Sequence, residues 1–410
     1  MRTTLALLAL LPLAPLAPAP GHAPAPACAA DNAGLSLPDG FCATLFADQL
    51  GIVRHLVALP NGDIVAAVGG GSGGVLVLRD TNGDGRADVI HRFGPTGGNG
   101  IAWGGGYLYF ATSNEVMRWP WKPGQTEPAG PPESVVTGLP VDGNHTTKSL
   151  ALGPDGALYV SVGSATNSCQ QADRTKQSPG HQPCTELDSR AGIWKFSASK
   201  HQQRQSDGVR WATGLRNAVA LATDPASGKL FAASHGRDQL GENWGFSDSL
   251  NAELPAEEFA EIHQGSDIGW PYCYYDQLQG KKLTAPEYGG DGKTVGKCAD
   301  TQPPLIGFPG HWGPMAIAFY NQSLFPVRYR GGAFIAFHGS WNRAPLPQAG
   351  YRVVFVPFAD GKPTGKYDTF ATLTGKPTGL RASGLAVGPD GALYIGADAS
   401  HQIWRVVPSR

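Results

Sequence analysis

The sequence predicts an all-β protein, a six-bladed β-propeller with four-stranded blades around a central channel. Two observations lead to this fold class. The chain contains 56 glycines and 34 prolines among its 410 residues, while 41% of the residues are hydrophobic, as expected for many short strands joined by turns. In addition, one pattern occurs six times along the chain, and sheets repeated in this way are typical of propellers.

The repeated pattern is a turn rich in Pro, Asn, Asp and Gly followed by a short strand of alternating polarity. Asn-Gly and Asp-Gly favour tight hairpins because these residues accept the positive φ that primed turns require. Each copy is followed by a further strand candidate, which favours four-stranded units. Residues 40–46 form one more strand candidate and are expected to complete the last blade. The six copies lie at residues 59–68, 105–112, 153–162, 224–233, 330–337 and 388–396.

Residues 1–27 are predicted to be a signal peptide, because Arg2 precedes an apolar stretch that is followed by small residues and prolines. Residues 28–410 then form a single propeller domain with a long insertion at about residues 238–300. No later segment has the ~20 apolar residues of a membrane-spanning helix, so we expect a periplasmic or secreted protein without membrane insertion. The formal net charge of −1 gives no basic surface for nucleic acid.

The six cysteines fall into three pairs of sequence neighbours, which suits three local disulfides in an oxidising compartment. Buried reduced thiols are the alternative. Acylation of Cys28, as in a lipoprotein, is a further alternative and would leave Cys42 without its partner. The expected pairs are Cys28 with Cys42, Cys169 with Cys184, and Cys273 with Cys298.

An acidic segment at residues 80–88 has the oxygen ligands and the turn glycine of a calcium loop. The expected ligands of this second Ca²⁺ are Asp80, Asn82, Asp84 and Asp88. His91 stands where such a loop has its bidentate Glu, and the flanking residues look like strands. A hairpin turn closed by its own Asp and Asn side chains is therefore the alternative.

Three further segments carry polar groups that could form a site. His145 precedes the turn at residues 153–156, Arg216 and Asn217 precede an apolar strand, and Gly236 and Arg237 follow that strand. In a propeller such segments meet at one mouth of the channel. By themselves they predict only a polar site of unspecified chemistry, since a lone His is more often a satisfied structural residue than a base.

Taken together, these segments resemble the soluble sugar dehydrogenases that depend on pyrroloquinoline quinone (PQQ), including their sorbosone-dehydrogenase-like relatives. The resemblance covers nearly the whole chain after the signal peptide. It rests on residues 54–56, on His145 ahead of residues 149–150, and on residues 215–217, 234–236, 269–271, 338–343 and 388–391.

The resemblance implies that PQQ lies across the channel mouth, with Ca²⁺ polarising its reactive carbonyl. His145 then corresponds to the family's catalytic base and Arg216 to its arginine at the quinone oxygens, with Asn217 as a hydrogen-bond donor beside it. The backbone carbonyls of Gly236 and Arg237 correspond to the Ca²⁺ ligands, and oxygen ligands suit this cation.

The resemblance also suggests residues that hold the cofactor's carboxylates, for which guanidinium groups are well shaped. Glu257 and Glu258 are expected to orient these arginines. Asn144, Gly98 and Ser383 stand where the best-known members have Asp, Gln and Arg, and these departures bear on whether PQQ is retained. The candidate PQQ contacts are Arg381, Arg343, Asn342 and, next to Gly98, Asn99.

The expected function is oxidation of an aldose or a sugar aldehyde by hydride transfer to PQQ, with electrons passing on to an external acceptor. Two alternatives come from other classes of protein. One is a non-enzymatic extracellular binding propeller, in which His145 and Arg216 only line the channel. The other is a propeller lactonase or another metal-dependent hydrolase, which would hold its metal at the channel axis with Glu, Asp and Asn side chains.

Overall fold

The computed structural model describes residues 28–71, 73–376 and 378–409. The predicted signal peptide lies outside the described residues. Within the described part of the chain, no helix is both long enough and apolar enough to cross a membrane.

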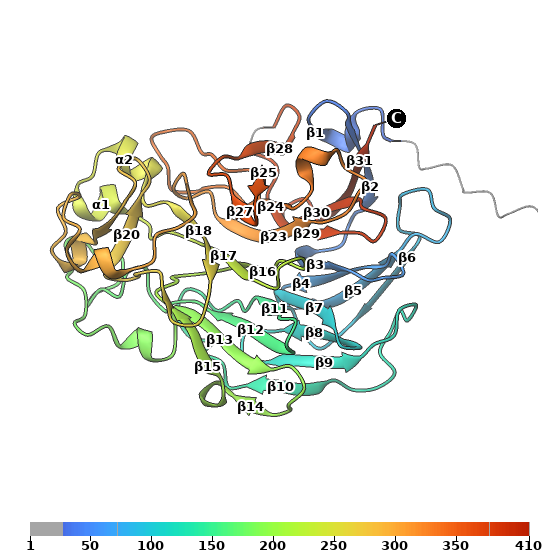
Figure 1. The fold of residues 1–410 in the computed structure, drawn as a ribbon, viewed down its shortest axis with the longest axis horizontal. Helices are drawn as coiled ribbons and strands as arrows, with labels where there is room; N and C mark the ends of the chain where they lie inside the picture. The colour runs from blue at the N-terminus through green and yellow to red at the C-terminus, as the bar shows by residue number, and fades with distance from the viewer. Residues whose placement is uncertain (1–27, 72, 377, 410) are drawn as a thin grey trace, which may run out of the picture.

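Six antiparallel sheets form the blades of a propeller (Figure 1), which confirms the predicted fold class. The first three blades, each from the channel outward, are β3 (Ile52–Ala58), β4 (Ile64–Gly69), β5 (Gly74–Arg79) and β6 (Val89–Phe93); β7 (Gly100–Gly104), β8 (Tyr107–Ala111), β9 (Val116–Pro120) and β10 (Glu133–Thr137); and β11 (Leu150–Leu152), β12 (Ala157–Val162), β13 (Gly192–Ser197) and β15 (Val209–Thr213).

The remaining blades follow in chain order. They are β16 (Ala220–Thr223), β17 (Leu230–Ser234), β18 (Glu257–Ile262) and β22 (Ile306–Phe308); β23 (Pro314–Tyr320), β24 (Gly332–Phe337), β25 (Arg352–Val356) and β28 (Asp368–Leu373); and β29 (Ala382–Val387), β30 (Leu393–Ala397), β31 (Gln402–Pro408) and β2 (Phe41–Ala47). The last blade closes the ring because β2, from the N-terminal end, pairs antiparallel with β31. The strand expected at residues 40–46 is thus confirmed.

Three blades carry a short fifth strand at the outer edge. The strands β14 (Gln203–Arg204) and β19 (Ser266–Asp267) add in parallel to β10 and β15, and β1 (Leu35–Ser36) adds antiparallel to β28. Outside the blades lie the hairpins β20 (Cys273–Asp276) with β21 (Lys281–Thr284) and β26 (Phe358–Ala359) with β27 (Lys362–Pro363), the helices α1 (Leu240–Trp244) and α2 (Asp248–Glu253), and the 3-10 helices η1 (Asn32–Gly34), η2 (Thr185–Asp188), η3 (Gln205–Asp207), η4 (Pro286–Tyr288), η5 (Gly296–Asp300) and η6 (Val327–Tyr329).

Each of the six repeated patterns covers the end of the connection between the first and second strands of its blade and then the second strand itself. The turn glycines Gly156 and Gly391 have φ of 75° and 85°, the left-handed conformation that glycine adopts without steric cost. Residues 238–300 contain both blade and non-blade structure, since β18 is the third strand of its blade while α1, α2, β20 and β21 lie outside the blades.

The core is divided among the six spaces between adjacent blades, and each space holds one cluster of buried apolar side chains. Both faces of a blade are therefore buried. In β8, Leu108 and Phe110 join the cluster on one side of the blade while Tyr109 and Ala111 join the cluster on the other. This explains why the strands are apolar in nearly continuous runs.

All three predicted disulfides are present, between Cys28 and Cys42, Cys169 and Cys184, and Cys273 and Cys298. The pairing of Cys28 with Cys42 occupies the thiol that the lipoprotein alternative requires.

Candidate active site

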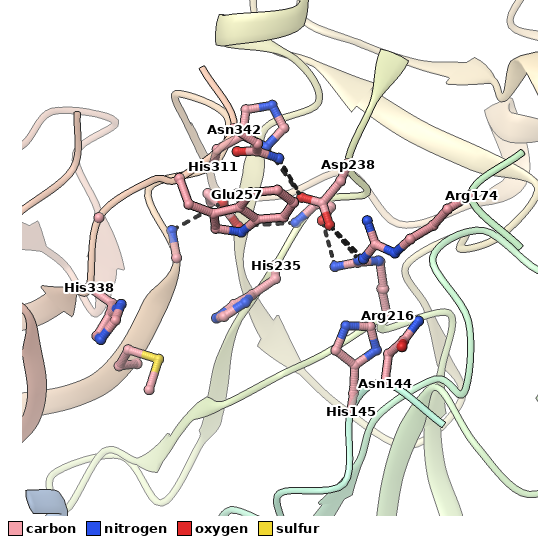
Figure 2. A pocket seen from close by; sticks show the side chains of 15 residues that line it. Asn144, His145, Arg174, Arg216, His235, Asp238, Glu257, His311, His338 and Asn342 are labelled. Carbon is pink, nitrogen blue, oxygen red and sulfur yellow. Dashed lines mark hydrogen bonds and ion pairs between the residues drawn. The ribbon is translucent and has the colours of Figure 1, made fainter. Parts of the chain in front are cut away.

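A cavity of about 370 Å³ opens at one mouth of the channel, where the connections flanking several inner strands meet. His145 comes from the connection before β11, Arg216 from the one before β16, and Asp238 from the segment after β17. His338 and Asn342 follow β24 on the other side (Figure 2). A propeller brings these distant segments together because its inner strands all surround one axis.

His145 is held by the connection that follows β12. Its Nδ1 lies 2.9 Å from the carbonyl oxygen of Ser164, and a carbonyl can only accept, so Nδ1 carries the proton and Nε2 keeps its lone pair. Burial together with the nearby Arg216 and His235 lowers the pKa of His145 to about 2. The imidazole is therefore neutral and has one free acceptor nitrogen at the cavity.

Arg216 is fully buried and its guanidinium is held on several sides. Its Nε and Nη2 donate to the main-chain oxygen and Oδ1 of Asn167, both at 2.9 Å. Its Nη1 donates to the carbonyl of Gly236 at 2.8 Å, and Nη2 also reaches Asp238 at 3.0 Å. Burial lowers the pKa of Arg216 and the charge of Asp238 opposes that shift, so the group remains a fixed cation beside His145.

Asp238 links Arg174 and Arg216 to Asn342 across the cavity, although it is not one of the predicted site residues. Its Oδ2 pairs with Arg216 and with Arg174, each at 3.0 Å, and its Oδ1 accepts from Asn342 Nδ2 at 2.8 Å (Figure 2). Burial by itself raises the pKa of Asp238, but Arg216, His311 and Arg174 together lower it below its usual range. In the sequence, Asp238 directly follows Gly236 and Arg237, the predicted Ca²⁺ ligands, and this position could have identified it as a site residue.

Asn217 is beside His145, with Gly163 between them: a Cβ at Gly163 would lie 2.5 Å from His145 Cβ and 3.0 Å from Asn217 Oδ1. Gly236 lines the cavity. The side chain of Arg237 is buried in an ion pair with Glu287 at 2.7 Å, and Arg237 is not among the residues that line this cavity.

A second charged cluster surrounds Asp398. Its carboxylate pairs with Arg54 Nη1 at 3.0 Å and with His338 Nε2 at 2.9 Å. Arg381 Nη1 lies 3.1 Å from His338 Nδ1, and Arg54 Nε donates to Asn99 Oδ1 at 2.9 Å. Arg54 and Asn99 line a neighbouring cavity of about 300 Å³. The predicted contacts Arg381 and Asn99 thus belong to one network, and Arg54, Asp398 and His338 are its unselected members.

Other candidates are placed differently. Asn342 reaches the cavity, whereas Arg343 is buried behind it and donates to the carbonyl of Gly310 and to the carboxylate of Glu253. Because its donors are used in this way, Arg343 holds the backbone around Gly310 and Glu253 together and does not face a ligand. Ser383 is buried and donates to the carbonyl of Val53 at 2.7 Å.

The expectation that Glu257 and Glu258 orient arginines is not what the geometry shows. Glu257 accepts from the backbone N–H groups of Gly236 at 3.0 Å and Gly313 at 3.2 Å, and burial raises its pKa to about 7. Glu258 forms a buried ion pair with Lys282. Glu257 therefore ties together two backbone segments that line the cavity.

The segment at residues 80–88 is closed by its own hydrogen bonds. Asp80 accepts from three backbone N–H groups of the loop, Asn82 from Asp84 N at 2.9 Å, and Asp88 from the hydroxyl and N–H of Thr81. This is the geometry of the hairpin-turn alternative, and a second Ca²⁺ at these residues stays a prediction.

The hydrolase alternative expects several Glu, Asp and Asn side chains to surround one metal ion. Among the described residues, the one group of three His, Cys, Asp or Glu ligand atoms within 4.8 Å of one another is Cys169, Cys184 and Glu186, and its two cysteines form a disulfide. The acidic and histidine side chains of the cavity do not converge in this way.

The donor set does suit an anionic planar cofactor with a hard cation. Arg174 and Arg216 share the single carboxylate of Asp238, which leaves positive charge for carboxylates and quinone oxygens. Gly236 lines the cavity, and its carbonyl oxygen, which accepts from Arg216 Nη1, has a second lone pair of the kind that Ca²⁺ prefers. The Oδ1 atom of Asn342 is buried and has no hydrogen-bond partner among the described residues. The residues present therefore fit PQQ and Ca²⁺.

Solved structures with this fold cover nearly the whole chain. The *Trichoderma reesei* member of Carbohydrate-Active Enzymes Family AA12, in its calcium structure, is 22% identical, with a TM-score of 0.76 over 92% of this chain and 97% of that chain. The holo form of the pyranose dehydrogenase PQQ domain from *Coprinopsis cinerea* is 19% identical, with a TM-score of 0.74 over 94% and 98%. The PQQ-bound aldose sugar dehydrogenase from *Streptomyces coelicolor* is 18% identical, with a TM-score of 0.57 over 91% and 100%.

Among curated proteins, an uncharacterized protein of *Borreliella burgdorferi* is 30% identical over 161 residues, which cover 39% of this chain. The match spans about 37% of the length of that relative. The family model described as TrAA12-like matches residues 35–409. The chain therefore belongs to the TrAA12-like family, and its resemblance to the PQQ-dependent sugar dehydrogenases is confirmed.

Proposed function

We propose that the protein oxidises the anomeric carbon of an aldose, or the hydrated carbonyl carbon of a sugar aldehyde, with His145 as the general base and PQQ as the hydride acceptor. The observation that carries this proposal is the state of His145. Its Nδ1–H is donated to the Ser164 carbonyl, so its unprotonated Nε2 can take the proton of a sugar hydroxyl at the cavity.

The charged groups around His145 support this role. A free imidazole with a pKa of about 2 is a weak base, since general bases work best near the operating pH. Burial is the largest cause of the low pKa and the charge of Arg216 is the next, so anionic charge bound beside Arg216 would raise the pKa of His145. The strength of His145 as a base therefore depends on whether an anionic ligand is bound beside Arg216.

Arg216 supplies fixed positive charge where negative charge develops as the substrate is oxidised. Its contacts with Asn167, Gly236 and Asp238 hold it in place, so no side-chain reorganisation is needed during the reaction. PQQ, when bound, supplies the two-electron acceptor that no side chain can provide. The main-chain oxygens of Gly236 and Arg237 would hold Ca²⁺, and Arg381, Asn99, Asn217 and Asn342 would hold PQQ.

The site of action is proposed to be the periplasm or the outside of the cell, with reduced cofactor reoxidised by an external acceptor. Three disulfides among the described residues support an oxidising compartment. The predicted signal peptide at residues 1–27 agrees with this location.

The test is dye-linked oxidation of a panel of aldoses and sugar aldehydes by the purified protein, with and without added PQQ and Ca²⁺. We expect activity that requires both additions and that falls by at least about a hundredfold in His145→Ala. His263→Ala is the matched control, because His263 is exposed in the turn after β18 and should keep full activity. Absence of PQQ binding and of activity on every sugar would refute the proposal.

A further inference from the structure

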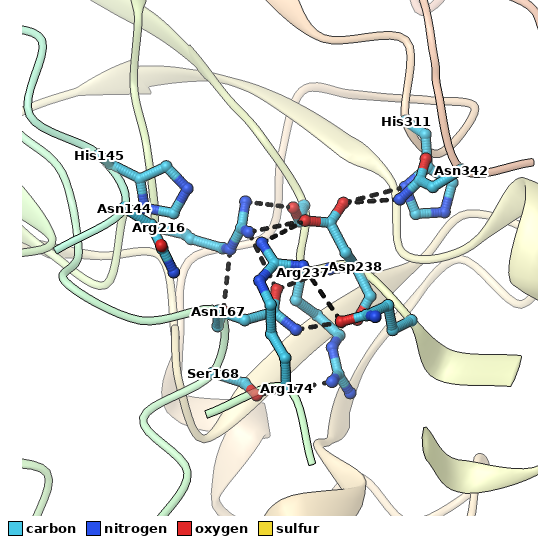
Figure 3. A network of polar contacts seen from close by, with 12 residues as sticks. Asn144, His145, Asn167, Ser168, Arg174, Arg216, Arg237, Asp238, His311 and Asn342 are labelled. Carbon is cyan, nitrogen blue, oxygen red and sulfur yellow. Dashed lines mark hydrogen bonds and ion pairs between the residues drawn. The ribbon is translucent and has the colours of Figure 1, made fainter. Parts of the chain in front are cut away.

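Asn167 occupies the centre of the polar network behind the cavity (Figure 3). It lies in the connection of residues 163–191 between β12 and β13, and its side chain is completely buried. Asn167 carries no charge and cannot react, yet it contacts both Arg216 and Asp238. The same connection provides Ser164, which holds His145.

The contact with Arg216 has the shape of a fork. The main-chain oxygen of Asn167 accepts from Arg216 Nε and its Oδ1 accepts from Arg216 Nη2, both at 2.9 Å. These two bonds hold one edge of the planar guanidinium, as a carboxylate would in a bidentate pair. The opposite edge, at Nη1, is thereby directed to the carbonyl of Gly236 and the cavity.

Asn167 itself has little freedom to move. Its Oδ1 also accepts from Asp238 N at 2.9 Å, and its Nδ2 donates to Asp238 O at 3.0 Å. Its main-chain oxygen also accepts from Trp270 Nε1 at 3.0 Å, and its N–H donates to Asp173 at 2.9 Å. Both acceptor oxygens are thus used twice, which fixes the side-chain rotamer.

The segment that carries Asn167 is anchored on both sides. Glu186 accepts from the backbone N–H groups of Ala165 at 2.6 Å and Thr166 at 3.2 Å. Two residues after Asn167, Cys169 forms its disulfide with Cys184. Asn167 is therefore held next to a loop that is closed covalently between Cys169 and Cys184.

We infer that Asn167 is a positioning residue that fixes the direction of Arg216 while leaving its charge free for an anionic ligand. An Asp at this position would offer the same two oxygens but add a second negative charge to the one that Asp238 already supplies. A further carboxylate in direct contact with Arg216 would reduce the positive charge that Arg174 and Arg216 present to an anion. The inference rests on the proposed function, because it takes PQQ as the anion.

The test measures binding of PQQ in the presence of Ca²⁺ by quenching of tryptophan fluorescence, without sugar, alongside thermal unfolding. Asn167→Asp keeps the two oxygens of the fork, adds a negative charge and loses the Nδ2 donor to Asp238 O. We expect PQQ to bind roughly tenfold or more weakly, because the added charge opposes the positive charge of Arg216. Asn167→Ala removes Oδ1 and adds no charge, so we expect a loss of roughly threefold to tenfold. Asn243→Asp is the matched control, because Asn243 is also buried, in α1, and does not line the cavity.

A purely structural role would lower the unfolding temperature of the variants without changing PQQ affinity of the folded protein. PQQ affinity within twofold of the original protein in the folded Asn167 variants, or an equal loss in Asn243→Asp, would overturn the inference. If Asn167→Asp does not fold, Asn167→Ala decides by the same criterion. Failure of the unmodified protein to bind PQQ would instead refute the proposed function, and the inference with it.

Discussion

Replacement of Asp238 by Asn tests whether the cavity's central carboxylate stabilises the fold. Asp238 is the charged partner of Arg216, whose side chain is only 5% exposed, and of Arg174, whose side chain is 30% exposed. Removing one partner of a buried ion pair leaves an uncompensated charge and costs about 3 kcal/mol. The more exposed pair with Arg174 adds less than about 1 kcal/mol.

A loss of about 3 kcal/mol in a domain of this size corresponds to a decrease in Tm of roughly 4 °C, from the average unfolding entropy per residue. The pH dependence has a definite sign. Because the pKa of Asp238 is lowered in the folded protein, its stabilising contribution is complete above the unfolded pKa of about 3.9 and declines as the pH falls below it.

The assay is thermal unfolding of the protein without PQQ at pH 7 and at about pH 3.5. The difference in Tm between the original protein and Asp238→Asn should be largest at pH 7 and smaller at the acidic pH. Asp155→Asn is the control, because Asp155 forms an exposed ion pair with Lys195 and its loss should change stability by less than about 1 kcal/mol. Equal Tm values for the original protein and Asp238→Asn at pH 7 would refute the reasoning.

Three further predictions concern the cavity and its rim. Burial raises the pKa of Glu257 to about 7, so the folded protein binds more protons than the unfolded chain and loses stability as the pH rises from about 4.5 to 7. Gln cannot ionise, so Glu257→Gln does not lose stability over this pH range. In thermal unfolding without Ca²⁺, the Tm of Glu257→Gln minus that of the original protein should therefore increase from pH 5 to pH 8. A difference in Tm that does not change with pH would contradict the assigned pKa. Arg381→Met should weaken PQQ binding roughly tenfold or more, measured by equilibrium titration, because a charge-assisted hydrogen bond is lost; unchanged affinity would remove Arg381 from the cofactor site. Trp341 is 66% exposed at the cavity, and Trp341→Ala should raise KM for a pyranose roughly twofold to tenfold at constant kcat, as loss of a stacking platform implies; an unchanged KM would exclude contact with the sugar.

The blades could be predicted from the sequence because their signals are local. Turn residues such as Gly156 and Gly391 determine the chain direction within four residues, and each strand carries its own apolar pattern. The fifth strands β1, β14 and β19 gave no such signal. Each has two residues, and each is a strand only because the edge of a neighbouring blade supplies its hydrogen-bond partners.

Site residues beside the inner strands were also predictable, since the closed ring of blades brings those positions to one channel mouth. His145, Arg216 and Asn217 belong to this class. Orientation within a loop was not predictable, because loops have no fixed side-chain period. Asn342 faces the cavity while the next residue, Arg343, is buried behind it.

In the connection at residues 163–191, side-chain orientation was even less predictable from the sequence. Asn167 and Arg174 carry no motif, and their positions depend on a disulfide, on Glu186 and on contacts with segments far along the chain. A sequence pattern records which residues share a strand face. It does not record where a long loop places an amide that completes a charge network.

The charges of this network explain why the site suits one class of cofactor. Arg237 and Glu287 neutralise each other in a buried pair, whereas Arg174 and Arg216 face the single carboxylate of Asp238. Arg216 itself is held mainly by neutral groups, the oxygens of Asn167 and the carbonyl of Gly236. An anionic cofactor is attracted by the two guanidinium groups of Arg174 and Arg216, whereas a neutral sugar gains much less from them.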